Sequence, residues 1–356
     1  MKSSLKAART EQRNPRSRGI DRKSTTGILR VLNREDALVA RAVRAEIPRI
    51  AAAVDAIVKA IERGGRLIYV GAGTSGRLAV LDAAECPPTF GTPPRIVQAI
   101  IAGGEKALRH AVEGAEDSAR DGARDLARMG VASNDVVVGI AASGTTPYVL
   151  GALKFAQQKR AITVGITANP RSPLARLARI AIAPKTGAEA IAGSTRMKAG
   201  TAQKMVLNLL STTAMIRLGR VYENWMVHVA LTNQKLKRRG MRILEEATGA
   251  TMAEAARLLR STQHDLPASL VMLETGASSA EARRQLAACR GNVRQAIRAA
   301  ASSRNDSRNA VSTATRTAAR TTRRGSSRGN SRNNARIAAR TGSRATPQAT
   351  KTRGQA

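Results

Sequence analysis

Aromatic residues are scarce, since Phe, Trp and Tyr make up 2 % of the 356 residues. The core must therefore be built from Ala, Val, Ile and Leu. Cysteine is almost absent too, and Cys86 and Cys289 make no disulfide framework, so we expect a reducing, cytoplasmic setting. No apolar run approaches the ~18 residues that cross a bilayer, and the N-terminus shows no secretory signal. We therefore expect no membrane association.

Acidic residues are outnumbered, with 25 Asp and Glu against 60 Lys and Arg and a formal net charge of +35. Residues 301–356 hold 13 basic residues against one acid, and residues 1–24 hold eight against two. The 301–356 segment has almost no large apolar residue, so we predict a disordered basic tail in weak, salt-sensitive contact with a polyanion. It contains no aromatic residue to stack on bases, so a specific nucleic-acid reader is not expected.

Between the two ends, two kinds of apolar pattern alternate. Residues 37–63 carry apolar positions at helical spacing and stop at Gly64-Gly65, and further helices are predicted over Arg196–Leu218 and Trp225–Leu236. Short apolar runs predict strands at Leu67–Val70, Ile96–Ile101, Val136–Ile140, Ile162–Ile166 and Ile180–Ile182. Strands that alternate with helices predict an α/β fold with a doubly wound, mainly parallel sheet.

An internal repeat of 27 residues occupies residues 248–300. TGATMAEAARLL begins at Thr248, and TGASSAEARRQL begins at Thr275. Each unit, marked by a glycine, predicts a pair of short helices that is too small to be stable alone. We therefore expect four regions: an N-terminal arm (1–36), a sheet domain (37–240), a small C-terminal helical subdomain (241–300) and the basic tail (301–356).

A glycine-rich turn follows the first predicted strand, where Gly71, Gly73 and Gly76 match G-x-G-x-x-G. Such a turn at a helix N-terminus binds phosphate. A dinucleotide site also needs an acid at the end of the second strand, but no acid precedes Glu105 there. We therefore predict a different phosphate ligand and no nucleotide cofactor.

Hydroxyl side chains accompany three such turns. In a doubly wound sheet the loops after the strands converge on one crevice, where hydroxyls and backbone N–H groups suit a sugar phosphate. Ordinary helix capping by Ser and Thr is the alternative. The predicted phosphate-binding residues are Thr74, Ser75, Gly76, Ser143, Gly144, Thr146 and Ser194.

Carboxylates follow the first turn and the second strand. Glu85 precedes Cys86-Pro87-Pro88, where we expect the prolines to end the helix and hold the carboxylate in place. Glu113 and Glu116 are expected on one side of another helix. Carboxylates at the crevice suit proton abstraction next to a carbonyl, whereas an acid considered alone is usually a solvated surface group.

Nucleophilic and metal sites have weaker support. Cys86 with His110 is a conceivable nucleophile pair, but nothing in the sequence indicates contact between them. The three histidines are too scattered for a metal set, so no metal is expected.

Four long strings carry a family resemblance: RLIYVGAGTSGRLAVLDAAECPPTFG, IAGGEKALRHAVEGAEDSARDG, DVVVGIAASGTTPYVLGAL and GAEAIAGSTRMKAGTAQKMVLN. Together with the rest of residues 10–300, they resemble the N-acetylmuramic acid 6-phosphate etherases, a family with the sugar-isomerase (SIS) domain. The resemblance implies a cytoplasmic homodimer without metal or cofactor that acts in cell-wall sugar recycling. Its substrate would be N-acetylmuramic acid 6-phosphate, whose D-lactyl ether it would cleave.

The resemblance also implies residue roles. Glu85 matches the general acid/base of the family and Glu116 its second catalytic glutamate, while Ser75, Ser143 and Thr146 match the phosphate-holding hydroxyls. Where the family commonly has Ser-Gly-Arg-Thr-Pro, this chain has Thr145 in place of the Arg. Arg77, Arg196 and Lys198 are the candidates to replace its charge.

Two other functions remain as alternatives to the etherase. The first is a non-catalytic regulator that binds sugar phosphates on the same fold, although a regulator needs neither glutamate. The second is a nucleic-acid-binding protein, which rests on charge alone.

Overall fold

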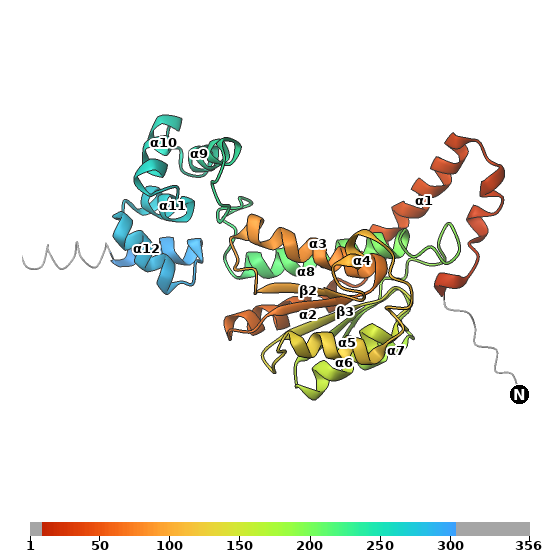
Figure 1. Cartoon of the computed structure of the whole chain (residues 1–356). Helices are drawn as coiled ribbons and strands as arrows, with labels where there is room; N and C mark the ends of the chain where they lie inside the picture. Colours follow the sequence, from red (N-terminus) through yellow and green to blue (C-terminus); the bar gives the residue numbers. More distant parts are fainter. Residues whose placement is uncertain (1–8, 304–356) are drawn as a thin grey trace, which may run out of the picture. The chain divides into compact units, whose positions relative to one another are not determined.

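The computed structural model describes residues 9–303 and is built around a parallel sheet of five strands (Figure 1). The strand order is β2-β1-β3-β4-β5. The strands are β1 Leu67–Gly71, β2 Val97–Ile101, β3 Val136–Ile140, β4 Ile162–Ile166 and β5 Ile180–Ile182. The predicted strands are thus confirmed to within one residue at each end. The inner strands β1 and β3 are fully buried, whereas the edge strands β2 and β5 are partly exposed.

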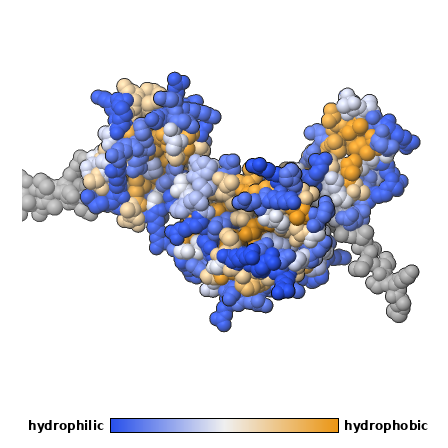
Figure 2. Space-filling view, in the orientation of Figure 1, coloured by the Kyte–Doolittle hydropathy of each residue, from blue (hydrophilic) through white to orange (hydrophobic). Residues whose placement is uncertain are grey.

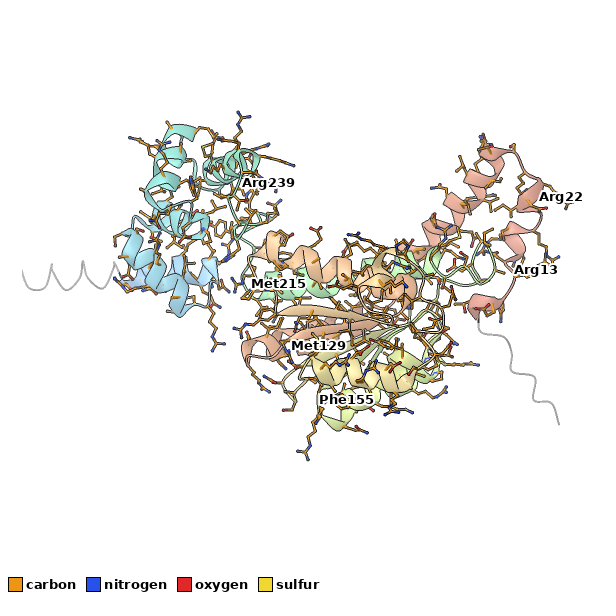
Figure 3. The ribbon with its side chains drawn as sticks, in the orientation of Figure 1. Arg13, Arg22, Met129, Phe155, Met215 and Arg239 are labelled. Atoms are coloured by element: carbon orange, nitrogen blue, oxygen red, sulfur yellow. The ribbon has the colours of Figure 1, made fainter. Side chains whose placement is uncertain are left out.

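Helices cover both faces of the sheet. One layer consists of α1 Thr25–Arg44, α2 Ile47–Glu62, α3 Gly73–Phe90 and α8 Lys198–Arg217, and the other of α5 Ala119–Arg128, α6 Pro147–Gln158 and α7 Pro173–Leu177. Tyr69 and Val138 point into the first layer, whereas Ile68 and Val137 point into the second. Figure 3 shows Met215 of α8 and Phe155 of α6 on these opposite sides.

The order of the strands creates a crevice. From β1 the chain moves out to the edge strand β2 and then returns to β3 on the other side of β1. The helices that follow β1 and β3 therefore leave toward opposite faces. A doubly wound sheet binds ligands at such a switch point, beyond the carboxyl ends of the strands.

Two helix predictions need correction. The pattern over residues 37–63 belongs to two helices, because α1 ends at Arg44 and α2 starts at Ile47 with Pro48 in its first turn. The helix predicted over Trp225–Leu236 is wrong: α9, Gln234–Thr248, is preceded by irregular chain. In this segment residues 227–228 form a turn, and Val227, Val229 and Leu231 are buried although none of them is in a helix.

The C-terminal repeat forms the predicted pairs of short helices, with a core of its own. Its helices are α10 Met252–Ser261, α11 Leu266–Thr275, α12 Ser279–Ala288 and helical residues 293–303, and α9, which ends where the repeat begins, packs into the same core. Gly249 and Gly276, which occupy equivalent repeat positions, end α9 and α11 with φ of 74° and 65°. The regional boundaries stay a prediction, and α9 crosses residue 240.

The remaining described elements are short: η1 Arg9–Glu11, η2 Pro15–Ser17, η3 Ile20–Arg22 and α4 Lys106–Arg109. None of the helices within residues 9–303 has the length and apolar character needed to cross a membrane. The predicted basic tail lies, from residue 304 onward, outside the described residues.

Candidate functional site

The first glycine turn is tightly packed. A Cβ on Gly71 would lie 2.6 Å from the backbone nitrogen of Gly76, and one on Gly76 would lie 2.5 Å from Cγ1 of Ile101. Glycine is therefore needed for the turn itself and for the approach of α3 to β2. The start of α3 at Gly73 leaves its first N–H groups at the crevice, where they suit an anion.

Ser75 and Thr74 face α8. Ser75 is buried and its hydroxyl donates to Oε1 of Gln203 at 2.9 Å, while the methyl group of Thr74 lies beside Gly200. Gln203 is only 3 % exposed, and its Nε2 has no hydrogen-bond partner among the described residues. Sequence reasoning missed Gln203, although an amide within the buried face of a helix is a usable signal.

The second turn joins β3 to α6. Oγ of Ser143 accepts hydrogen bonds from the backbone N and the hydroxyl of Thr145, at 3.2 and 2.9 Å. Ser143 can still donate its own proton. Gly144 has φ of 71° and a Cβ there would lie 2.2 Å from Oγ of Ser172, so no other residue fits. Thr146 caps α6 and its side chain makes no capping bond, which leaves its hydroxyl available to a ligand.

The third turn differs from the prediction. The carboxylate of Glu189 already accepts hydrogen bonds from the backbone N–H groups of Lys198 and Ala199, at 3.0 and 2.9 Å. The N-terminus of α8 is therefore not an open phosphate site. Ser194, which is half-buried, can take part only through its own hydroxyl.

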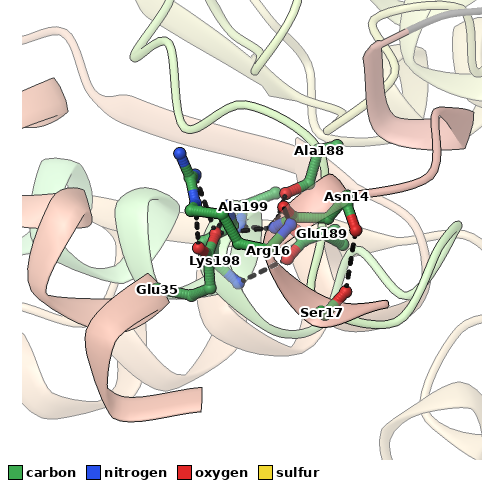
Figure 4. A network of polar contacts seen from close by, with 8 residues as sticks. All are labelled: Asn14, Arg16, Ser17, Glu35, Ala188, Glu189, Lys198 and Ala199. Atoms are coloured by element: carbon green, nitrogen blue, oxygen red, sulfur yellow. Dashed lines mark hydrogen bonds and ion pairs between the residues drawn. The ribbon is translucent and has the colours of Figure 1, made fainter. Parts of the chain in front are cut away.

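Lys198 belongs to a buried network that ties the N-terminal segment to α8 (Figure 4). Its Nζ donates to Glu35 at 2.6 Å, and Glu35 also accepts hydrogen bonds from Asn14 at 2.7 Å and from Arg16. The bond from Arg16, followed by those from Lys198 and Asn14, outweighs burial and lowers the pKa of Glu35 to about 2. Lys198 is 1 % exposed and its charge is paired with Glu35, so it cannot replace the missing family Arg.

Arg77 and Arg196 are the other two candidates to replace the charge of the family Arg, and their surroundings differ. Arg77 donates to the backbone oxygens of Leu108 and His110, both at 3.2 Å, and so fastens the segment after β2 to α3. Arg196 is exposed and has no hydrogen bond or ion pair within residues 9–303. Arg196 is thus the cation that remains free for a substrate.

Glu116 lies beside the second turn. Its backbone oxygen accepts a hydrogen bond from the N–H of Tyr148 at 3.0 Å, which places it next to the start of α6. The helix predicted for Glu113 and Glu116 is wrong, because Gly114, with φ of 73°, turns the chain there. Both carboxylates are exposed to solvent.

Glu85 lies further along α3, nine residues beyond Gly76, or about 13 Å along the axis. It is exposed. The prediction that the prolines end the helix is wrong, since α3 continues through Pro87 and Pro88 and ends at Phe90, before Gly91. The two prolines remove two backbone hydrogen bonds, but the N–H of Gly91 bonds the backbone oxygen of Pro87 at 2.9 Å and closes the last turn.

Neither alternative chemistry finds support in the described residues. Cys86 is buried in the core, where its thiol donates to the backbone oxygen of Asp82 and burial raises its pKa to about 12. The Cys86–His110 hypothesis is therefore wrong. Within residues 9–303, no three His, Cys, Asp or Glu side chains gather as a metal site.

Two family models match the chain, and the SIS domain model agrees with the fold. The description "SIS domain" matches residues 117–213, and "Glucokinase regulatory protein N-terminal SIS domain" matches residues 49–157. A phosphoheptose isomerase from Francisella tularensis is similar in structure at 21 % identity and a TM-score of 0.42, over 54 % of this chain and 96 % of that one.

Curated relatives are much closer in sequence. The N-acetylmuramic acid 6-phosphate etherases of Salmonella typhi and Salmonella typhimurium are each 51 % identical over 288 residues. The alignments cover 81 % of this chain and 97 % of each relative. At this identity over nearly the whole length of the relatives, the chain belongs to the N-acetylmuramic acid 6-phosphate etherase family.

Proposed function

We propose that the protein cleaves the D-lactyl ether of N-acetylmuramic acid 6-phosphate, giving N-acetylglucosamine 6-phosphate and D-lactate in cell-wall amino sugar recycling. It would thus be a carbon–oxygen lyase. The observation that carries this proposal is the 51 % identity to etherases over 97 % of their length. The crevice, with two hydroxyl-lined turns and a nearby carboxylate, supports it independently.

The phosphate would bind where the two turns meet. The N–H groups that begin α3 at Gly73 to Gly76, together with the hydroxyls of Thr74, Ser143 and Thr146, would supply neutral donors. Ser75 would join them once its hydroxyl turns away from Gln203, and Gly144 lets the backbone approach closely. Arg196 and Ser194 would contact the substrate's polar groups from the α8 side. No cofactor is needed for this binding.

The chemistry then consists of proton transfers. In the open-chain aldehyde the C2 proton is acidic, and a glutamate carboxylate removes it. The C3–O bond breaks with its electron pair on oxygen, which takes a proton from the second carboxyl group and leaves as lactate. Water adds to the unsaturated aldehyde, its OH at C3 and a proton at C2. Glu85 and Glu116 are the carboxylates that we assign to these steps.

A second subunit would complete the site. Leu81 is exposed on α3 one helical turn before Glu85, and Leu209 and Ile216 are exposed on α8. Figure 2 shows this apolar area over the two helices. We infer a homodimer that covers this face and brings Glu85 into a closed site. An Ile216→Asp variant that stays dimeric in light scattering would count against it.

The decisive assay is release of D-lactate from N-acetylmuramic acid 6-phosphate. Glu85→Gln and Glu116→Gln should each lower kcat by about 10²–10⁴-fold. Glu113→Gln, an exposed neighbour in the same turn as Glu116, is the matched control and should retain activity. In heavy-oxygen water, the C3 hydroxyl of the product should acquire the label.

A regulator is the second candidate, because the glucokinase regulatory protein domain matches residues 49–157. It would bind N-acetylmuramic acid 6-phosphate and release no lactate. Binding without turnover in the wild-type chain would therefore replace the etherase by the regulator.

Two finer points complete the proposal. We infer a cytoplasmic location, in keeping with two free cysteines in the described part of the chain. Weak polyanion contact through the basic tail is tested by deletion of residues 301–356. This deletion should abolish polyanion binding and leave turnover intact.

A further inference from the structure

A second hollow lies at the amino ends of the strands, whereas the crevice lies beyond their carboxyl ends. It is a cavity of about 290 Å³ between the ends of α2 and α8, the approach to β2 and the turn after α12. An adjoining cavity of about 360 Å³ shares Arg220 and Arg290 with it. Because α2 ends just before β1 begins, these cavities lie at the amino ends of the strands. They are separate from the substrate crevice.

Close contacts define the walls of this junction. A Cβ on Gly219 would lie 2.2 Å from Cγ of Asn292, and one on Gly91 would lie 2.6 Å from the backbone oxygen of His228. Arg290 also donates to the backbone oxygen of Glu62 at 2.9 Å. At these two glycines the segments of the junction thus touch without room for one further methyl group.

Arg220 is the unusual group in the junction. It is half-buried and lines both cavities, yet its guanidinium makes no hydrogen bond or ion pair with any residue in the described range. By contrast, Arg283 lies 3.3 Å from the carboxylate of Asp265. A guanidinium carries five donors, and leaving them unpaired away from water is unfavourable. Burial accordingly lowers the pKa of Arg220.

The charges around the first cavity are unbalanced. Arg217 is paired with Asp55 at 3.8 Å, which leaves Arg220 and Arg290 with Glu62 as the acid that lines the cavity. A phosphate monoester carries a charge of about −1.5 to −2 at pH 7. His228 of the adjoining cavity adds no charge, because burial and the nearby Arg220 lower its pKa to about 4. Thr92 lines the first cavity and its buried hydroxyl has no partner among residues 9–303.

We propose that this junction is a second ligand site, where Arg220 and Arg290 bind the phosphate of a small phosphate monoester. The ligand's body would lie against the apolar wall formed by Ile96, Met215 and Leu218. Arginine suits this task because its planar fork matches phosphate oxygens. The volume is near the lower end of the range for small-molecule sites.

The test uses phenyl phosphate, which combines a phosphate with an apolar body, at constant ionic strength. Trp225, the only tryptophan of the chain, stands between Arg220 and His228 in the sequence and packs against the core of the C-terminal helices, so its fluorescence is the readout. The full chain should show a saturable change. Arg220→Gln should weaken it about tenfold or more, because charge-assisted bonds are lost. Arg238→Gln, an exposed arginine on α9, removes the same charge and should match wild type.

Further variants separate this site from the crevice. Ser75→Ala/Ser143→Ala should weaken phosphate binding at the crevice and leave the Trp225 titration unchanged, whatever reaction the crevice catalyses. Arg290→Gln provides an independent probe if Arg220→Gln does not fold. An Arg220→Gln titration equal to wild type, or the absence of a saturable signal in the wild-type chain, would overturn the proposal.

Discussion

Glu35 and Asp82 are both buried carboxylates in contact with α8, but their surroundings are opposite. Glu35 is held by Arg16, Lys198 and Asn14, and its pKa falls to about 2. Among residues 9–303, the Asp82 carboxylate accepts hydrogen bonds only from neutral donors, the hydroxyls of Tyr69 at 2.9 Å and Ser211 at 3.1 Å. Burial therefore raises the pKa of Asp82.

The difference reflects what each cluster joins. The charged cluster around Glu35 connects the N-terminal segment to α8. Its contact with Lys198 spans 163 residues of sequence, and without it this lysine would be buried without a partner. The neutral cluster of Tyr69, Asp82 and Ser211 joins β1, α3 and α8, which already share an apolar core. We infer that the first carboxylate is required for a segment to dock, whereas the second adjusts a packing that other contacts provide.

The largest expected effect is that of Glu35→Gln. The amide leaves Lys198, which is 1 % exposed, without a counter-charge, so we expect the free energy of unfolding to fall by about 3–5 kcal/mol. Urea unfolding of the full chain measures it. The double variant Glu35→Gln/Lys198→Met removes both charges and should recover much of the loss. Equal instability of the single and double variants would contradict the role of the buried charge.

The pH dependence of stability should separate the two carboxylates. The pKa of Glu35 is lower in the folded chain, so its contribution is fully present above about pH 4.5 and is lost as pH falls toward 2. The pKa of Asp82 is raised, so its contribution is present below about pH 3.8 and is lost as pH rises. Urea unfolding between pH 2.5 and 7 gives the slope of the unfolding free energy against pH. Glu35→Gln and Asp82→Asn should change this slope in opposite directions. Parallel slopes in the two variants would refute the comparison.

Much of the fold follows from local patterns, whereas these clusters do not. The strands and the glycine turns are visible in the sequence because short apolar runs and left-handed turns are local properties. The pairing of Glu35 with Lys198, the cap that Glu189 places on α8 and the contact of Gln203 with Ser75 depend on segments that meet only after folding. Nothing in the spacing of these residues indicates their contacts.

The candidate site, too, could be predicted from the sequence only in part. Its turns could be located because each follows a strand. The orientation of Glu85 on a helix that continues past two prolines, and the turn that carries Glu116, depend on backbone details that single-residue preferences do not determine. The helix predicted over Trp225–Leu236 is wrong because an apolar pattern over a short segment does not distinguish a helix from irregular chain that is also buried.

At the N-terminus of α8, beside Lys198, Glu189→Gln should have an intermediate effect on stability. The carboxylate caps two backbone N–H groups of α8 and places a negative charge at its positive end, whereas the amide retains one oxygen acceptor and no charge. We expect a loss of about 1–2 kcal/mol in the free energy of unfolding. Glu105→Gln, which changes an exposed carboxylate, is the control and should unfold like wild type. A loss as large as that of Glu35→Gln would mean that capping, rather than charge balance, dominates this region.

Asp82→Asn should have the smallest effect at pH 7, within about 1 kcal/mol of wild type. No cation loses its partner, since the donors to Asp82 are two hydroxyl groups that can turn to accept from the amide. Removal of a buried charge also offsets part of any lost hydrogen bonding. Urea unfolding gives the value, and Ser211→Ala measures one of the two bonds separately. If Asp82→Asn destabilised the chain as much as Glu35→Gln, the neutral cluster would be as necessary for docking as the charged one.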